Sequence, residues 1–361
     1  MKKFYRAALD KLTPYVPGKP IQEVQRELGL SDVVKMASNE NPLGPSPRGV
    51  NAVKKAADEI HFYPEGSCFE LRKVMAKKLG VEENQLIFGN GSDELLLMLS
   101  QAFFNPGDEI IQGDPKLTFV EYRAVTNVAD AVPVFVDMKD FAYDLEAMAA
   151  KITDRTKLIF IANPNNPTGS FITRKEFEEF LEKVPEDVIV VLDEAYYEYV
   201  ERADTPEITD YIKAGKNVIA LRTFSKIYGL AGLRIGYGIA KKEIIDVLER
   251  VRQPFNVNSL AQAGAAAAMS DIRHIEASRR NNMEGREYLY GALEIMKLSF
   301  VKSEANFVFI DLKADAKEVT RKLMQEGVIV RQIGLPTTIR VTVGTKEQNE
   351  RFIATLKNAI K

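Results

Sequence analysis

The 361-residue sequence contains one cysteine, two histidines and a net charge of only -2. The single cysteine, Cys68, excludes an internal disulfide bond and fits a reducing compartment. His61 and His274 are far apart in the chain and lack the spacing of metal ligands, so we expect no metal site. The small net charge gives no electrostatic reason to expect a nucleic acid or an anionic membrane as a partner.

Long apolar runs and nucleotide-binding loops are also missing. No window approaches the roughly 18 apolar residues of a transmembrane helix, and no apolar core follows the basic N-terminal residues, so we expect a cytoplasmic protein without a signal peptide. The pairs Gly89-x-Gly91 and Gly236-x-Gly238 lack the third glycine of a dinucleotide-binding loop, and no Walker loop occurs. These absences argue against enzymes that depend on dinucleotides or nucleoside triphosphates.

The sequence does contain many short apolar runs that are rich in β-branched residues and are separated by expected helices such as 174–183. This alternation predicts a doubly wound α/β fold with a mostly parallel sheet. The expected strands are 85–88, 109–112, 131–136, 158–162, 188–192, 218–221 and 236–240, and a helix is expected before them over 49–60.

The C-terminal part of the chain has a different pattern. A long helical region over about 260–296 precedes the expected strands 306–312, 328–331 and 338–343 and the expected helices 316–327 and 345–360. Thr345 and Gln348 have the spacing of a capping box for the last helix. We therefore expect a large domain over residues 48–258 and a smaller α+β domain over 259–361, with an N-terminal arm and irregular loop, residues 1–47, that packs with the small domain.

One stretch, Thr223 to Gly238, follows an expected strand and combines a lysine, hydroxyl groups, an arginine and four glycines. Ligands bind in open α/β sheets where the strands end. Glycines let the backbone approach a ligand, hydroxyl and guanidinium groups bind phosphate, and a desolvated lysine near a second cation becomes nucleophilic. The pattern suggests pyridoxal phosphate held by Lys226 as a Schiff base. The alternative, an ordinary solvated lysine, stays open from this stretch alone.

Two further motifs follow strands of their own, Asn163-Pro-Asn-Asn-Pro-Thr-Gly169 and Asp193-Glu-Ala-Tyr196. The 33 residues from Asp193 to Lys226 are about one helix-plus-strand crossover, so all three motifs can reach the same edge of one parallel sheet. A Gly-x-Gly-Ser turn at Gly89 before an expected helix adds a natural phosphate seat, although it is also good capping chemistry without a ligand.

With the segments 15–20, 38–46 and 338–344, these motifs resemble the fold-type I, pyridoxal-phosphate-dependent aminotransferases and, within them, the histidinol-phosphate aminotransferases. The resemblance implies an amino transfer between histidinol phosphate/imidazole-acetol phosphate and 2-oxoglutarate/glutamate in histidine biosynthesis. Aromatic amino-acid aminotransferases and phosphothreonine decarboxylases share almost every motif. A non-catalytic, cofactor-binding regulator is an alternative of another class, but such regulators are expected to carry an added DNA-binding segment, and none is seen.

The resemblance also implies roles for single residues. Lys226 binds the cofactor aldehyde and then carries the proton, and Asp193 pairs with the pyridine nitrogen. Tyr196 and Asn166 contact the phenolic oxygen, and Asn166 also shapes its turn and contacts substrate. Phe119 matches the aromatic residue that stacks on the ring, although Leu117 replaces the usual proline before it and a core position is the alternative. The expected phosphate ligands are Gly91, Ser92, Asp93, Thr223, Ser225 and Arg234.

The resemblance also implies that the irregular loop 31–47 lies over the active site, with a simple linker as the alternative. Substrate and subunit contacts are implied in the same way. Arg340 lies in an apolar strand, where a charge is costly unless it is paired, and it is expected to bind the carboxylate of glutamate or the phosphate of histidinol phosphate in turn. Arg331 is a second candidate for an anion, with a surface salt bridge as the alternative, and Tyr15 is expected to line the same pocket. Tyr63 is expected to reach the neighbouring cofactor phosphate in a homodimer, with simple interface packing as the alternative.

Overall fold

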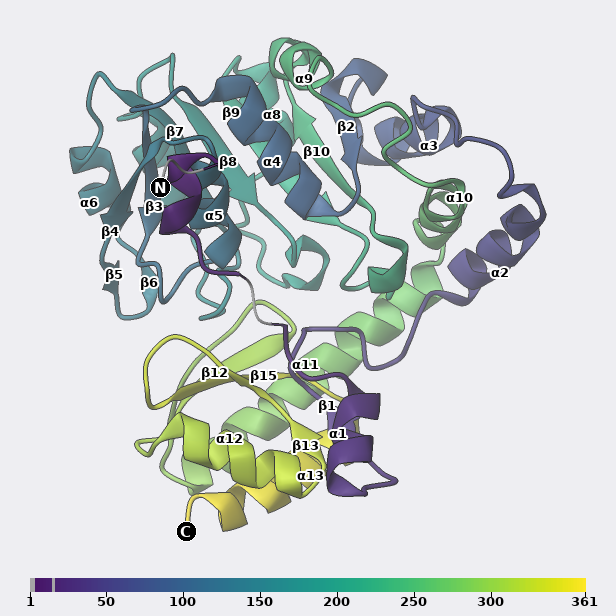
Figure 1. Cartoon of the computed structure of the whole chain (residues 1–361), viewed down its shortest axis with the longest axis vertical. Helices are drawn as coiled ribbons and strands as arrows, with labels where there is room; N and C mark the ends of the chain where they lie inside the picture. Colours follow the sequence, from purple (N-terminus) through teal and green to yellow (C-terminus); the bar gives the residue numbers. More distant parts are fainter. Residues whose placement is uncertain (1–3, 15–16) are drawn as a thin grey trace.

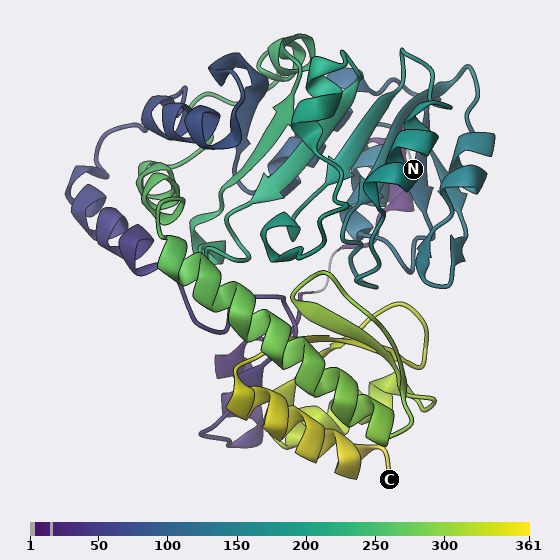
Figure 2. The ribbon, with the colours of Figure 1, turned by 180° about the vertical axis from the view of Figure 1, so that it is seen from behind.

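The computed structural model describes residues 4–14 and 17–361. The chain forms a larger lobe around a seven-stranded sheet and a smaller lobe around a four-stranded sheet (Figure 1). The long helix α11 (Ile272–Ile295) runs from the larger lobe into the smaller one, which is clearest from behind (Figure 2). No helix among the described residues has the length and apolarity needed to cross a membrane.

The large sheet is mostly parallel, as the sequence predicts. Its order is β2 (Leu86–Gly89), β10 (Gly236–Ala240), β9 (Val218–Thr223), β8 (Ile189–Asp193), β7 (Thr156–Ala162), β3 (Glu109–Gly113) and β4 (Val132–Val136). Only β10 runs in the opposite direction to the other six strands. Each expected strand is present, with ends within two residues of the expected ones.

Helices cover both faces of this sheet because its strands are apolar on both sides. On β7, Ile159 and Ile161 belong to one apolar core, whereas Phe160 between them belongs to the other. The first core includes residues of α3 (Phe69–Leu79), α6 (Leu145–Ala150), α7 (Arg174–Leu181), α8 (Ile208–Lys213) and α10 (Ser259–Ala268). The second includes residues of α4 (Ser92–Phe103), α5 (Val120–Val128) and α9 (Lys242–Leu248). The sheet is therefore doubly wound.

The smaller lobe has an antiparallel sheet with the order β11 (Ser299–Val301), β12 (Phe307–Asp311), β15 (Thr338–Thr342) and β14 (Arg331–Gln332). A separate core joins this sheet to α11, α12 (Ala316–Gln325) and α13 (Lys346–Ala359). The expected capping box is confirmed, because Thr345 accepts from the N–H of Gln348 and the Gln348 side chain accepts from the N–H of Thr345.

The N-terminal residues contact both lobes. After α1 (Ile21–Leu28), the short strand β1 (Val34–Lys35) pairs in parallel with β13 (Val328–Ile329) of the smaller lobe. The 3₁₀ helix Ala7–Lys11 instead lies against α5, where the Lys11 ammonium is 3.1 Å from the Asp130 carboxylate. The arm thus spans the two lobes, whereas the sequence suggested packing with the small domain.

Three other elements differ from the expectation. The expected strand 328–331 is wrong as one element, because β13 pairs with β1 whereas β14 pairs with β15. The expected helical region over 260–296 is divided between α10 and α11, and the Asp271 side chain at this break accepts from the hydroxyl of Ser46. The helix α2 (Pro47–Ala56) ends earlier than the expected residue 60 and continues as a 3₁₀ turn.

Candidate active site

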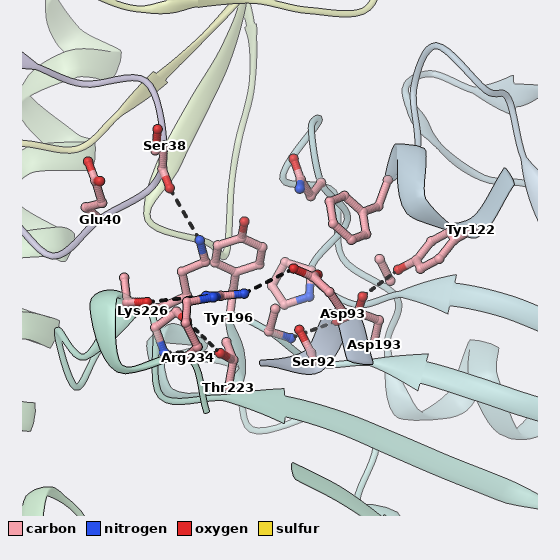
Figure 3. A pocket seen from close by; sticks show the side chains of 17 residues that line it. Ser38, Glu40, Ser92, Asp93, Tyr122, Asp193, Tyr196, Thr223, Lys226 and Arg234 are labelled. Carbon is pink, nitrogen blue, oxygen red and sulfur yellow. Dashed lines mark hydrogen bonds and ion pairs between the residues drawn. The ribbon is translucent and has the colours of Figure 1, made fainter. Parts of the chain in front are cut away.

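A cavity of about 270 Å³ opens where β7, β8 and β9 end, at the carboxyl edge of the large sheet (Figure 3). All three sequence motifs reach it, because parallel neighbouring strands deliver their following loops to one edge. The predicted site residues that line it are Ser92, Asp93, Phe119, Asn166, Asp193, Tyr196, Thr223, Ser225, Lys226 and Arg234.

Lys226 presents its amine to this cavity from the loop after β9. Its Nζ donates to the backbone oxygen of Ser38 at 3.3 Å and lies 5.7 Å from the centre of the Tyr196 ring. Burial, with the nearby positive charge of Arg340, lowers the pKa of Lys226 to about 8. A useful fraction of the amine is therefore unprotonated near neutral pH, which suits a nucleophile and a base.

Asp193 is the acid of the site and is almost completely buried at the end of β8. The hydroxyl of Tyr122 donates to Asp193 Oδ2 at 2.7 Å, and the N–H of Ala195 donates to Oδ1 at 3.2 Å. Burial raises the pKa of Asp193 to about 6, although both hydrogen bonds oppose the shift. A cation placed against this carboxylate would be stabilised by it, as a protonated ring nitrogen requires.

Tyr122 is a site residue that the sequence did not reveal as such. It lies one helical turn after Phe119, whose ring meets the Tyr122 ring edge to face at 5.6 Å. On its other side Tyr122 stacks on Phe160 of β7 at 4.5 Å. The spacing of one helical turn from Phe119 could have revealed Tyr122, because it places both aromatic residues on the same side of a helix that begins at the sheet edge.

The opposite end of the cavity is suited to an anion. Arg234 NH2 lies 3.2 Å from Asp93 Oδ2, and the Thr223 hydroxyl donates to the Ser225 hydroxyl at 3.0 Å. The α4 N-terminus lies beside them, and its N-cap residue, Gly91, makes no side-chain cap. Gly91 has a φ of +81°, and a Cβ there would be 2.6 Å from Arg234 NH2. Because Gly91 has no side chain, a phosphate group could come close to the backbone N–H groups at the start of α4.

Arg340 joins the small lobe to the Asn-rich turn after β7. Its guanidinium donates to the side-chain oxygen of Asn166 and, at 2.8 Å, to the backbone oxygen of Ala37. It lies 5.3 Å from the centre of the Phe307 ring and is mostly buried. Because Asn166 accepts with its oxygen, its amide N–H groups can donate to a ligand in the cavity.

Asn39 is a second residue that the sequence did not single out. Its Nδ2 donates to the Tyr196 hydroxyl at 2.8 Å, and its Oδ1 accepts from the Thr342 hydroxyl at 3.2 Å. Asn39 has a φ of +55°, a conformation that asparagine tolerates better than most residues. The 31–47 loop was expected over the site, but nothing in its sequence distinguishes Asn39 from Asn41.

A second cavity, of about 440 Å³, adjoins the first and shares Lys226, Tyr196, Asn166, Phe119 and Ser38 with it. Arg340 and Arg331, the two candidates for binding a substrate anion, both line it. Tyr15 lies outside the described residues. Tyr63 lines neither cavity: its side chain is 83% exposed and stacks on Phe255 at 5.0 Å. No group of metal-ligating side chains occurs within residues 4–14 and 17–361.

The doubly wound sheet, with a lysine, an aspartate and an arginine around one cavity, agrees with a single class of protein. The family model for aminotransferase class I and II matches residues 31–356, and the chain belongs to this family.

Individual relatives and solved structures narrow the class. Histidinol-phosphate aminotransferase from Moorella thermoacetica is 53% identical over 98% of this chain and 92% of the relative. The protein of that name from Caldicellulosiruptor saccharolyticus is 46% identical over 99% of this chain and 100% of the relative. The crystal structure of histidinol-phosphate aminotransferase from Sinorhizobium meliloti in complex with pyridoxal-5'-phosphate has a TM-score of 0.92 at 26% identity, over 100% of this chain and 98% of that one.

Proposed function

We propose that the chain is a pyridoxal-phosphate-dependent aminotransferase that moves an amino group between histidinol phosphate/imidazole-acetol phosphate and 2-oxoglutarate/glutamate, a step of histidine biosynthesis. The single observation that carries this assignment is the identity of 53% and 46% to two histidinol-phosphate aminotransferases over nearly the whole chain. The cofactor follows from the family and from the pyridoxal phosphate in the S. meliloti structure. The geometry around Lys226 and Asp193 is compatible with it.

Pyridoxal phosphate, when bound, supplies the electron sink for the negative charge that develops at the substrate carbon. The chain supplies position, charge and a proton carrier. The Lys226 amine, with its pKa lowered to about 8, would hold the cofactor aldehyde and, once the substrate amine has displaced it, would take up and return the proton of the substrate carbon. The Asp193 carboxylate would keep the ring nitrogen of the cofactor protonated, and the Tyr122 hydroxyl holds that carboxylate in place.

The remaining residues orient the ring and the substrate. Tyr196 and the Asn166 amide would donate to the phenolic oxygen of the cofactor, while Phe119 would pack on the ring face. Arg340 and Arg331, with Tyr15, receive the anionic end of either substrate. The proposed phosphate ligands are Gly91, Ser92, Asp93, Thr223, Ser225 and Arg234, of which Asp93 acts by orienting the Arg234 guanidinium.

Steady-state rates test the substrate. The purified protein is assayed with histidinol phosphate, phenylalanine, tyrosine and threonine phosphate, with 2-oxoglutarate as the acceptor for the amines. We expect the highest kcat/KM with histidinol phosphate. Equal or better turnover of the aromatic pair, or decarboxylation of threonine phosphate, would replace the proposed substrate with one of those alternatives. A yellow protein whose chromophore is trapped on Lys226 by borohydride tests the cofactor independently of the substrate.

We further propose a homodimer in which Tyr63 reaches the neighbouring site. The support is that Tyr63 and Phe255 form an exposed aromatic pair, beside which Ile60 and Phe62 are also exposed. Mixing inactive Lys226→Ala chains with impaired Tyr63→Ala chains should recover activity, because a mixed dimer contains one site with both residues. Tyr63→Phe separates the roles: lost cofactor affinity indicates a contact of the hydroxyl with phosphate, whereas unchanged affinity indicates packing alone.

Two assignments complete the proposal. We place the domains at residues 48–258 and 259–361, with residues 1–47 as an arm that contacts both. We keep the cytoplasm as the location because Cys68 is a single, buried thiol without a disulfide partner.

A further inference from the structure

The second cavity, of about 440 Å³, is lined by basic side chains and by no acidic ones among the described residues. Four cationic residues line it beside Lys226, namely Lys116, Arg123, Arg331 and Arg340. Cations that share one concave site repel each other, and low-dielectric walls strengthen that repulsion. Such a set is stable when a ligand of high negative charge occupies the site.

Two of these cations belong to the segment that follows β3 and have no place in the site as proposed so far. Lys116 lies in the turn before α5, and Arg123 lies on α5 itself. Neither side chain forms a hydrogen bond or an ion pair with any residue in the described part of the chain. Arg123 is half-buried, and a guanidinium removed from water normally has a partner for its five N–H groups.

The helix α5 holds Arg123 at a fixed position relative to the reacting groups. Tyr122 directly precedes it and is hydrogen-bonded to Asp193, and Phe119, one turn earlier, lines both cavities. Because α5 also packs on the sheet through Tyr122 and Val125, Arg123 cannot move far from the acid of the site. Side chains on such rigid elements define substrate length and charge more sharply than side chains on loops.

We propose that Arg123, assisted by Lys116, is a further specificity-determining residue that binds the phosphate ester of the amino substrate from the side of the large sheet, opposite Arg331 and Arg340. This inference rests on the proposed function. A phosphate monoester carries a charge of about -1.5 to -2 at neutral pH and accepts several charge-assisted hydrogen bonds. An uncharged aromatic side chain in the same place would leave the half-buried Arg123 guanidinium without a partner, which disfavours aromatic amino acids.

The test compares histidinol phosphate with histidinol, which differ only in the phosphate. In Arg123→Gln we expect kcat/KM for histidinol phosphate to fall about tenfold or more, through KM, as for loss of a charge-assisted hydrogen bond, while the value for histidinol stays within about twofold. Arg123→Lys should recover part of the loss. Lys175→Gln, which removes an exposed charge on α7, is the control for long-range charge effects and should leave both values unchanged.

A binding measurement gives a second readout that does not depend on turnover. Inorganic phosphate should inhibit the wild-type enzyme competitively against histidinol phosphate, and Arg123→Gln should raise its inhibition constant about tenfold. Equal losses on both substrates, or no loss on either, with an unchanged inhibition constant would overturn the role of Arg123. If instead the wild-type enzyme does not turn over histidinol phosphate, the proposed function fails, which is a different result.

Discussion

Arg222 and Glu194 form a buried ion pair, with Nε 2.7 Å from Oε2, and neither residue lines the cavity. Arg222 directly precedes Thr223 on β9, and Glu194 directly follows Asp193 of β8. Neighbouring side chains on a strand point to opposite faces. The pair therefore links the ends of β8 and β9, while the adjacent residues, Asp193 and Thr223, line the cofactor site. The Arg222 guanidinium also lies 3.4 Å from the centre of the Tyr197 ring.

Breaking this pair should destabilise the fold. Glu194→Gln leaves the Arg222 charge buried without its counter-charge, and the loss of one partner of a buried pair costs roughly 3–5 kcal/mol. The double variant Arg222→Met/Glu194→Leu should recover most of this loss because no buried charge remains. Urea denaturation measures both free energies of unfolding. A single variant as stable as the wild type would show that water reaches the pair.

The hydrogen bond from Tyr122 should set the acidic limb of the pH profile. Burial raises the pKa of Asp193 to about 6, and the Tyr122 hydroxyl opposes that rise by stabilising the carboxylate. Tyr122→Phe removes only the hydroxyl, so the pKa of Asp193 should rise further. We expect the affinity of the cofactor-free protein for pyridoxal phosphate to decline at a higher pH in Tyr122→Phe than in the wild type. Identical titration curves would exclude the contribution of this bond.

Lys226 should make the cofactor-free protein less stable below about pH 8. Its pKa is about 8 in the folded chain and 10.5 for an ordinary lysine side chain, so the unfolded chain binds more protons between these values and stability rises with pH across that window. Lys226→Met should therefore stabilise the cofactor-free protein at pH 7, by about 1–3 kcal/mol. The gain should shrink as the pH rises from 8 to 10.5, and thermal unfolding at several pH values measures it. A gain that is independent of pH would indicate better packing of methionine instead.

Gly91 should be required for cofactor affinity and not only for backbone conformation. In Gly91→Ala the new Cβ would be 2.6 Å from Arg234 NH2 and the residue would keep a φ of +81°. The displaced arginine should weaken pyridoxal phosphate binding about tenfold or more, as for the loss of a charge-assisted contact. Gly80→Ala is the matched control, because its φ is +66° but no atom lies within 4 Å. Equal dissociation constants for both variants would assign the effect to strain alone.

Much of this architecture could be predicted from the sequence because the physical signals are local. Apolar runs such as 158–162 must be buried on both faces, so they predict the strands of a doubly wound sheet, and strand ends then place Asp193 and Lys226 at one edge. The capping box at Thr345 is likewise a local pattern. Patterns of this kind depend only on spacing along the chain, so they can be recognised without knowledge of tertiary contacts.

The tertiary structure alone decided which distant side chains meet. Asn39 reaches Tyr196 across 157 residues of sequence, Tyr122 reaches Asp193 across 71, and Arg340 reaches Asn166 across 174. The same holds for the strand expected at 328–331, which divides because β1 and β15 each bind one half. Burial lowers the pKa of Lys226 and raises that of Asp193, and it arises only in the folded chain because desolvation depends on all surrounding atoms and not on neighbours in the sequence.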